Sequence, residues 1–292
     1  MKKKLGFIIS IVILAVVLFL ASQYIDLGKA MDVLSRADIL LLFAAIVLET
    51  VSMGLKTLKW KLFTDELNPA ISFGELFQVQ CFGIALSNLT PARLGEASKA
   101  LYLEKHGIKK RLTLLTILWD HLLDIIAIVA FSTLIATSYG TITAAFLAAT
   151  LVLIVIAYNS DSIVKRLAGF KQLTFLSEFT LHKFRKITLL KAMLVTFASW
   201  GVELLAVSLA FHAVGATLPF TTIIGAYAIS MIIGLLSTIP GGLGSLDATL
   251  FLLLKDAATA PVLAAAVIAA RLVTIIWIYI LGGISAITMH KK

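Results

Sequence analysis

The sequence has few charged residues, few prolines and a single cysteine. Only 14% of its 292 residues are Asp, Glu, Lys or Arg, whereas a soluble globular domain carries about 25% charged residues. The lone Cys81 excludes an internal disulfide framework and a zinc site built from several cysteines. The chain therefore lacks the charged surface that a soluble protein of this length needs.

Hydrophobic residues make up 60% of the chain, and they are concentrated in long runs. A helix needs roughly 20 apolar residues to cross the hydrocarbon core of a bilayer. This composition predicts an all-α integral membrane protein that forms a single transmembrane domain over residues 1–292. The runs that predict six membrane-spanning helices are 5–21, 39–58, 112–136, 142–158, 189–212 and 262–287.

Two further apolar stretches, 73–104 and 221–254, are each interrupted in the middle by proline and glycine. Each stretch could cross the membrane twice, or could enter and leave on the same side as a re-entrant hairpin. The arms beside each break are about 10–17 residues long, which is mostly too short for a full crossing. Their lengths favour two broken re-entrant hairpins.

The distribution of basic residues supports this topology. Lysine and arginine accumulate on the cytoplasmic side of membrane proteins. With both hairpins re-entrant, 19 of the 25 basic residues, Lys56 and Lys59 among them, fall on the cytoplasmic side, and only Lys29, Arg36 and Lys255 fall outside. This predicts a multi-pass protein of the cell (inner or plasma) membrane with both termini in the cytoplasm. The net charge of +9 then reflects topology and anionic lipid, and a nucleic-acid partner is not expected.

The two interrupted stretches share the pattern Pro-x-x-Leu-Gly, at 91–95 and at 240–244. The two prolines lie 149 residues apart (240 − 91), which is about half of the chain. Each half, 1–137 and 138–292, contains three predicted spans, so the halves would run antiparallel. Inverted repeats with broken helices near the midplane are typical of secondary transporters. A coincidental match of a short pattern is the alternative.

Several ionisable side chains lie within the predicted spans. A charged side chain at a helix centre costs roughly 2.5–3.5 kcal/mol on insertion scales, so we expect these groups to face one another or a water-filled cavity. Arg271 is the one basic residue deep in a predicted span, and it needs a carboxylate partner. A structural ion-pair cluster and a substrate or proton path both fit the set, which is Glu49, Asp120, His121, Asp124, Glu203 and Arg271.

The breaks have chemistry of their own. A proline is tolerated in the first turn of a helix, and such a helix directs free N–H groups and its positive dipole end at the break, which makes an anion site. Arg93 and Lys99 could hold a phosphate there, while Glu96 and Asp247 either cap the second arms or pair with Arg93 and Arg271. The predicted headgroup site comprises Asn88, Pro91, Arg93, Gly95, Glu96, Lys99, Pro240, Gly241, Gly242, Gly244 and Asp247.

Signs of catalysis are weak. The five histidines are scattered without a metal-ligand pair, and no nucleophile elbow, nucleotide fingerprint or Walker loop is present. The sequence therefore predicts no metal, no cofactor and no enzymatic activity.

Three motifs together resemble those of a known family. They are residues 88–96 (NLTPARLGE) with Lys99, the pattern Asp120-His121-x-x-Asp124 where the family usually shows Glu-Arg-x-x-Asp, and residues 240–247 (PGGLGSLD) with Arg271. With these residues the chain resembles the flippase-like membrane domain of lysylphosphatidylglycerol synthases and of stand-alone relatives.

The resemblance implies that the protein moves a phosphate-bearing lipid between leaflets, either a phospholipid, an aminoacyl-phospholipid or a polyprenyl-phosphate carrier. The synthases of the family add a soluble aminoacyl-transferase domain for which this chain has no room, so lipid lysylation is not expected. Without an ATP motif, movement must be downhill or coupled to protons or another ion. A proton-coupled small-solute transporter is the alternative, and a scaffold with a structural charge cluster is the third interpretation.

Overall fold

The computed structural model describes residues 27–67, 70–134, 148, 150–152 and 184–290. Every regular element in these ranges is helical, and four helices are long and apolar enough to cross a bilayer. They are Ile39–Thr64, Lys110–Ser132, Lys186–Ala213 and the continuous helix Ala260–His290. The predicted all-α membrane architecture is confirmed for this part of the chain. The predicted span 5–21 and nearly all of 142–158 lie outside the described residues.

The elements in chain order are α2 (Leu27–Ser35), α3 (Ile39–Thr64), α4 (Phe73–Leu89), η1 (Pro91–Ala97), α5 (Ser98–Lys105), α6 (Lys110–Ser132), α10 (Lys186–Ala213), α11 (Phe220–Leu236), η3 (Pro240–Gly242), α12 (Ser245–Leu254), α13 (Ala260–Arg271), η4 (Leu272–Ile276) and α14 (Trp277–His290). The turns η1 and η3 are 3₁₀-helical, and η4 is a π-helical turn inside the long C-terminal helix.

Local sequence signals account for two of the helix starts. Asp38 caps α3 by accepting hydrogen bonds from the backbone N–H groups of Leu40 at 2.8 Å and Leu41 at 3.2 Å. Ser72 and Glu75 form a reciprocal capping box at the start of α4. Both devices satisfy backbone donors that a helix start leaves free.

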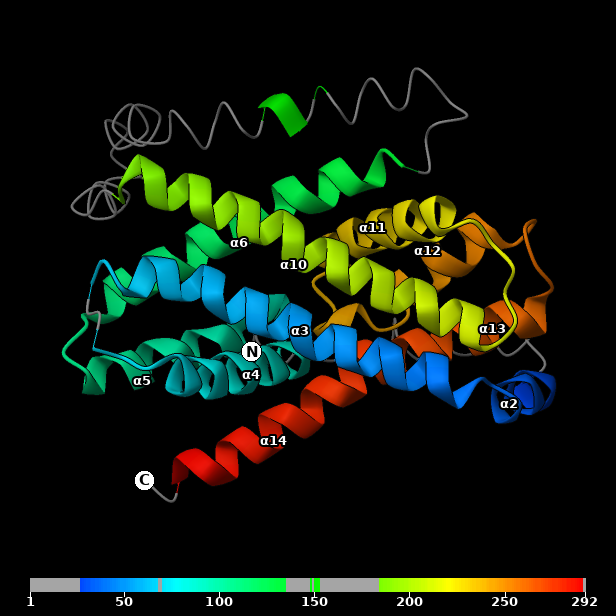
Figure 1. The fold of residues 1–292 in the computed structure, drawn as a ribbon, viewed down its shortest axis with the longest axis horizontal. Coiled ribbons are helices and arrows are strands. Elements are labelled where there is room, and N and C mark those ends of the chain that lie inside the picture. The colour runs from blue at the N-terminus through cyan, green and yellow to red at the C-terminus, as the bar shows by residue number, and fades with distance from the viewer. Residues whose placement is uncertain (1–26, 68–69, 135–147, 149, 153–183, 291–292) are drawn as a thin grey trace, which may run out of the picture.

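Helices α3 and α10 pack side by side through the middle of the bundle (Figure 1). Small residues allow the close approach, since the Ser52 hydroxyl donates a hydrogen bond of 3.0 Å to the Ser199 carbonyl oxygen. Helix α4 packs against α14, and α6 packs against α11. The largest apolar cluster joins α10, α11, α12 and α13 and is rich in alanine. These contacts surround the two interrupted stretches with long helices.

Both interrupted stretches turn back on themselves. In the first, a Cβ on Gly95 would lie 2.3 Å from the Leu86 carbonyl carbon, so the chain after the break packs directly on α4. In the second, Leu246 of α12 packs on Gly234 of α11. The two breaks also meet, because a Cβ on Gly241 would lie 3.4 Å from the Asn88 carbonyl oxygen. Two short-armed hairpins therefore touch at their breaks.

The prediction that Lys56 and Lys59 belong to a cytoplasmic segment after the first described span is wrong. The helix runs to Thr64, six residues beyond the predicted end at 58, and it carries Lys56 and Lys59 into the bundle, where Lys59 is fully buried. These lysines therefore do not belong to a cytoplasmic loop, and Arg271 is not the only deep basic residue. The physical reason is that buried carboxylates on neighbouring helices neutralise both ammonium groups.

The contact between α14 and α4 gives a test of this packing. A Cβ on Gly282 would lie 2.5 Å from the Ala85 Cβ, whereas a Cβ on the next residue, Gly283, would meet nothing within 4 Å. Gly282→Ala should therefore lower the free energy of unfolding by about 1–3 kcal/mol through overpacking, and Gly283→Ala should not. Unfolding in detergent micelles measures both variants, and equal stability of the two would contradict the packing of α14 on α4.

Candidate functional site

Both breaks border one central cavity of about 270 Å³. Its walls come from α3, α4, α6, α10, α11, α12 and the long C-terminal helix. The cavity brings together residues that the sequence predicted from separate motifs. Those that line it are Glu49, Asn88, Arg93, His121, Glu203, Gly241, Gly242 and Arg271.

The backbone is strained where the breaks meet the cavity. Arg93 (φ 58°) and Thr238 (φ 55°) are the two residues other than glycine with positive φ in the described ranges, and both line the cavity. A left-handed conformation at such a residue costs of order 1–3 kcal/mol and is concentrated at functional sites. The π-helical turn η4 also contributes Thr274 and Ile275 to the wall, and π-bulges frequently mark such sites.

Arg93 brings an unpaired positive charge to the cavity. Its side chain is half-buried. No carboxylate oxygen of the described residues lies within 4.0 Å of its guanidinium nitrogens, the limit for an ion pair. Asn88 lines the same cavity with an amide that makes no hydrogen bond to the described protein. Pro91 begins η1, and Thr90 closes the turn by accepting a 2.7 Å hydrogen bond from the Gly95 N–H. The first break therefore offers the cavity a cation and a neutral donor.

The part of the wall formed by α3 and α10 holds two carboxylates and one ammonium. Lys56 pairs with Glu203 across the α3–α10 contact, and its ammonium lies 4.7 Å from the centroid of the Trp200 ring. Glu49 is 2% exposed, and its Oε2 has no hydrogen-bond partner. This wall is consequently one cation short of neutrality when both glutamates are ionised.

A second charge cluster lies behind this wall. The Lys59 ammonium is 2.6 Å from Asp124 Oδ1 and 2.8 Å from Asp120 Oδ1. The Trp200 indole N–H donates a 2.8 Å hydrogen bond to Asp124 Oδ1. Asp120 and Asp124 therefore join α6 to α3 and α10, and neither lines the cavity. For these two residues, the structural ion-pair interpretation describes the arrangement better than a substrate path.

The prediction that Lys99 holds a phosphate is wrong. Its side chain is fully buried and donates a 2.8 Å hydrogen bond to Glu96 Oε2, and the ammonium lies 5.1 Å from the centroid of the Trp60 ring. Gly83 makes room for it, since a Cβ there would lie 2.8 Å from Lys99 Cε. Lys99 therefore neutralises Glu96 inside the hairpin, and neither residue lines the cavity.

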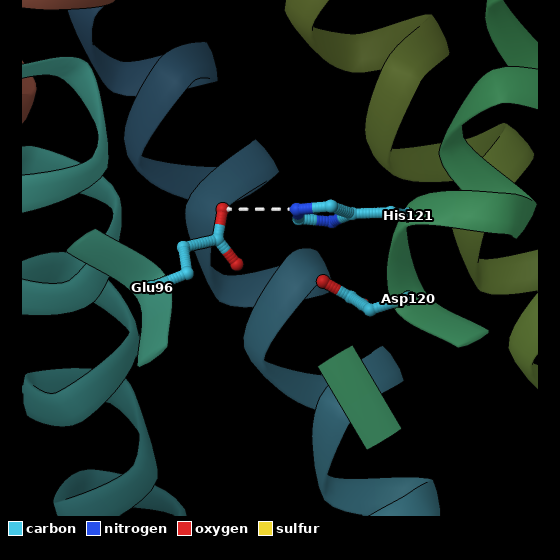
Figure 2. A group of neighbouring side chains, drawn as sticks. All are labelled: Glu96, Asp120 and His121. Atoms are coloured by element: carbon cyan, nitrogen blue, oxygen red, sulfur yellow. Dashed lines mark ion pairs between the residues drawn. The ribbon is translucent and has the colours of Figure 1, made fainter. Parts of the chain in front are cut away.

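Figure 2 shows Glu96, Asp120 and His121 directed toward one another from η1 and α6. One ligand atom from each lies within 4.8 Å of the others, and His121 Nε2 is 3.6 Å from Glu96 Oε1. The sequence had shown no such grouping around any histidine. Each carboxylate already contacts an ammonium group, Lys99 or Lys59. A divalent cation here would lie close to two positive charges, so the arrangement is that of an ion-pair cluster.

The second break is held by Arg271. Its Nε donates a 2.5 Å hydrogen bond to Asp247 Oδ1, and its two other nitrogens donate to the carbonyl oxygens of Gly241 at 3.1 Å and Gly242 at 3.3 Å. The predicted carboxylate partner for Arg271 is therefore confirmed. Gly241 and Gly242 both have positive φ, a backbone conformation that glycine adopts without a steric penalty.

The start of α12, which follows Pro240 and η3, was predicted to offer N–H groups to an anion, with Asp247 either capping this helix or pairing with Arg271. Asp247 does both, since its Oδ1 accepts a hydrogen bond from Arg271. Asp247 Oδ2 already accepts a 2.8 Å hydrogen bond from the Gly244 N–H. The positive end of α12 is therefore occupied by a carboxylate of its own first turn.

Lys56, Trp200, Tyr227 and Thr238 also line the cavity, although no sequence motif marked them. The spacing of Lys56 from Glu49 in the sequence could have predicted its place at the cavity. Lys56 follows Glu49 by seven residues, which places both side chains on one face of α3 two turns apart. A lysine on the same face as a buried glutamate indicates that the helix continues into a polar interior.

The comparison with known sequences agrees with these motifs. The family described as "Lysylphosphatidylglycerol synthase TM region" matches residues 7–283. The chain belongs to this family. A UPF0104 membrane protein of Methanothermobacter thermautotrophicus is 27% identical over 89% of this chain and 88% of its own length. Another, of Pyrococcus horikoshii, is 26% identical over 100% of this chain and 98% of its own length.

Proposed function

We propose that this family member translocates a phosphate-bearing lipid between membrane leaflets and is not an enzyme. The observation that carries the proposal is the unpaired Arg93 guanidinium at the cavity between the two breaks. Arginine binds phosphate through two parallel hydrogen bonds, and the Asn88 amide offers a further donor to the same cavity. Phospholipids, aminoacyl-phospholipids and polyprenyl-phosphate carriers all present the phosphate that this pair would bind.

The surroundings of the breaks favour a lipid over a small solute. Leu89 and Leu94 flank the first break, Leu236 precedes the second, and all three are more than half exposed. Leu235 lines the cavity itself and is 39% exposed. A lipid needs a polar site for its headgroup beside an apolar surface for its acyl chains. The exposed leucines provide the apolar surface that a lipid requires and that a water-soluble substrate does not use.

The proposal includes a topology. Residues 1–137 and 138–292 form an inverted repeat in which α3 corresponds to α10, η1 to η3, and α6 to the long C-terminal helix. The hairpins enter from opposite sides, and both termini are cytoplasmic in the cell membrane. The contact between η1 and η3 supports this arrangement, because broken helices of such repeats meet near the midplane. Since the sequence has no ATP motif, movement is downhill or coupled to an ion.

Transport by the purified wild-type protein tests the function. Proteoliposomes containing a fluorescent phospholipid or polyprenyl-phosphate analogue should lose the inner-leaflet label to an outside quencher faster than protein-free liposomes do. A fluorescent lipid of the same chain length without phosphate should move at the protein-free rate. If none of the phosphate-bearing lipids moves faster under any ion gradient, the proposal fails. Proton-dependent uptake of a soluble substrate would then favour the small-solute transporter.

A further inference from the structure

Among the acidic residues that line the cavity or lie in the charge clusters around it in the described part of the chain, Glu49 is the one without an ion-pair partner. Each of the others has an ammonium or guanidinium partner: Glu203 has Lys56, Asp247 has Arg271, Glu96 has Lys99, and Asp120 and Asp124 share Lys59. Glu49 lines the cavity at 2% exposure, with its Oε2 unpartnered. An isolated ionised carboxylate in such a place is costly, and taking up a proton removes the charge.

The groups that face Glu49 come from three helices. On α3 itself, Lys56 lies two turns along the same face, and its ammonium is directed to Glu203 on α10. Tyr227 of α11 lines the same cavity and interacts electrostatically with both glutamates. One ammonium therefore serves two carboxylates, and the tyrosine hydroxyl adds no positive charge.

We propose that the Glu49 carboxyl is a proton-binding site that exchanges with the water of the cavity and couples proton movement to lipid translocation. The coupling to lipid translocation rests on the proposed function. The proton-binding site itself rests only on the geometry of Glu49, Lys56 and Glu203. A proton on Glu49 makes this group of three neutral and leaves the Lys56–Glu203 pair intact.

Loss of the proton creates a competition for one ammonium. Ionised Glu49 attracts Lys56 toward its own helix, away from Glu203 on α10. The Lys56–Glu203 pair joins the two helices that pack side by side through the bundle (Figure 1). Proton release therefore weakens a contact between the corresponding helices of the two halves, which is where a transporter built from repeats must move.

Infrared difference spectroscopy measures the proton site without any transported lipid. The purified wild-type protein should show the C=O band of a protonated carboxyl group that disappears as the pH is raised. Glu49→Gln should lose this band. Glu104→Gln is the matched control, because Glu104 is an exposed acid on α5 that pairs with Lys110 at the surface, and this variant should keep the band. An unchanged band in Glu49→Gln would overturn the proton site.

A transport measurement tests the coupling. In proteoliposomes with a fluorescent phospholipid, wild-type and Glu104→Gln proteins should translocate at different rates under the two opposite pH gradients. Glu49→Gln should lose this difference. Wild-type translocation at one rate under both gradients would overturn the coupling while the lipid function stands. A titrating Glu49 band in a protein that moves no lipid would keep the proton site and refute the proposed function.

Discussion

Lys59→Met should destabilise the folded protein by about 3–5 kcal/mol, which is the cost of breaking a buried ion pair by removing one partner. The Lys59 side chain is fully buried and lies within 3 Å of both Asp120 Oδ1 and Asp124 Oδ1. Methionine fills a similar volume but leaves two carboxylates without a cation. Among the described residues, the Trp200 indole alone still donates a hydrogen bond to Asp124. Thermal or denaturant unfolding in detergent measures the loss.

The chain offers a matched control for this change. Lys110 pairs with Glu104 at 3.1 Å, and both side chains are about half exposed, so Lys110→Met should cost roughly 0–1 kcal/mol. Adding Asp120→Asn and Asp124→Asn to Lys59→Met should recover part of the stability, because no buried charge is then unpaired. If Lys59→Met and Lys110→Met unfold alike, the cluster does not stabilise the bundle as the ion-pair geometry indicates.

Much of the helical architecture could be predicted from the sequence because a bilayer imposes a simple length rule. Apolar runs of about 20 residues must become helices that satisfy their own backbone, and α3, α6, α10 and the C-terminal helix follow that rule. The break positions at Pro91 and Pro240 also follow from local chemistry, since proline begins η1 and η3. These features depend on short-range sequence alone.

Pairing between charges could not be predicted in the same way. The sequence shows which residues are ionisable, but the choice of partner depends on how helices rotate against one another. Lys59 meets Asp120 and Asp124 from a helix some sixty residues away. Its position near the end of an apolar run resembles that of an interfacial lysine. The sequence therefore predicted a loop position for Lys59, and it left the acids that Lys59 neutralises open between a structural ion-pair cluster and a substrate or proton path.

The different roles of Arg93 and Lys99 also depend on how the chain packs. Arg93 and Lys99 are equally basic and lie six residues apart beside one break, and the sequence could not separate their roles. In the folded chain, α5 turns back along α4, so Lys99 is buried against Glu96 while Arg93 stays at the turn. The hairpin geometry leaves one of the two basic side chains for a ligand.

Arg93→Ala should lower phospholipid translocation by about 10- to 100-fold, because a hydrogen bond to a charged group contributes about 1.5–3 kcal/mol. The change removes the positive charge that the first break presents to the cavity and leaves the fold intact, since no described carboxylate pairs with Arg93. Arg93→Lys should be partly tolerated, because lysine keeps the charge without the planar fork that binds phosphate through two bonds. Quenching of a fluorescent phospholipid in proteoliposomes measures all three proteins.

Two features make this comparison specific. Alanine and lysine take up the left-handed backbone of residue 93 with the same kind of strain as arginine, so stability should change little among the variants. Arg36→Ala is the matched control, because Arg36 is an exposed residue directly after α2 that pairs with Asp32 of α2 and does not line the cavity. This variant should translocate lipid at the wild-type rate. If Arg93→Ala folds and still moves phospholipid at the wild-type rate, the headgroup does not bind at the first break, since no other unpaired cation of the described residues lines the cavity.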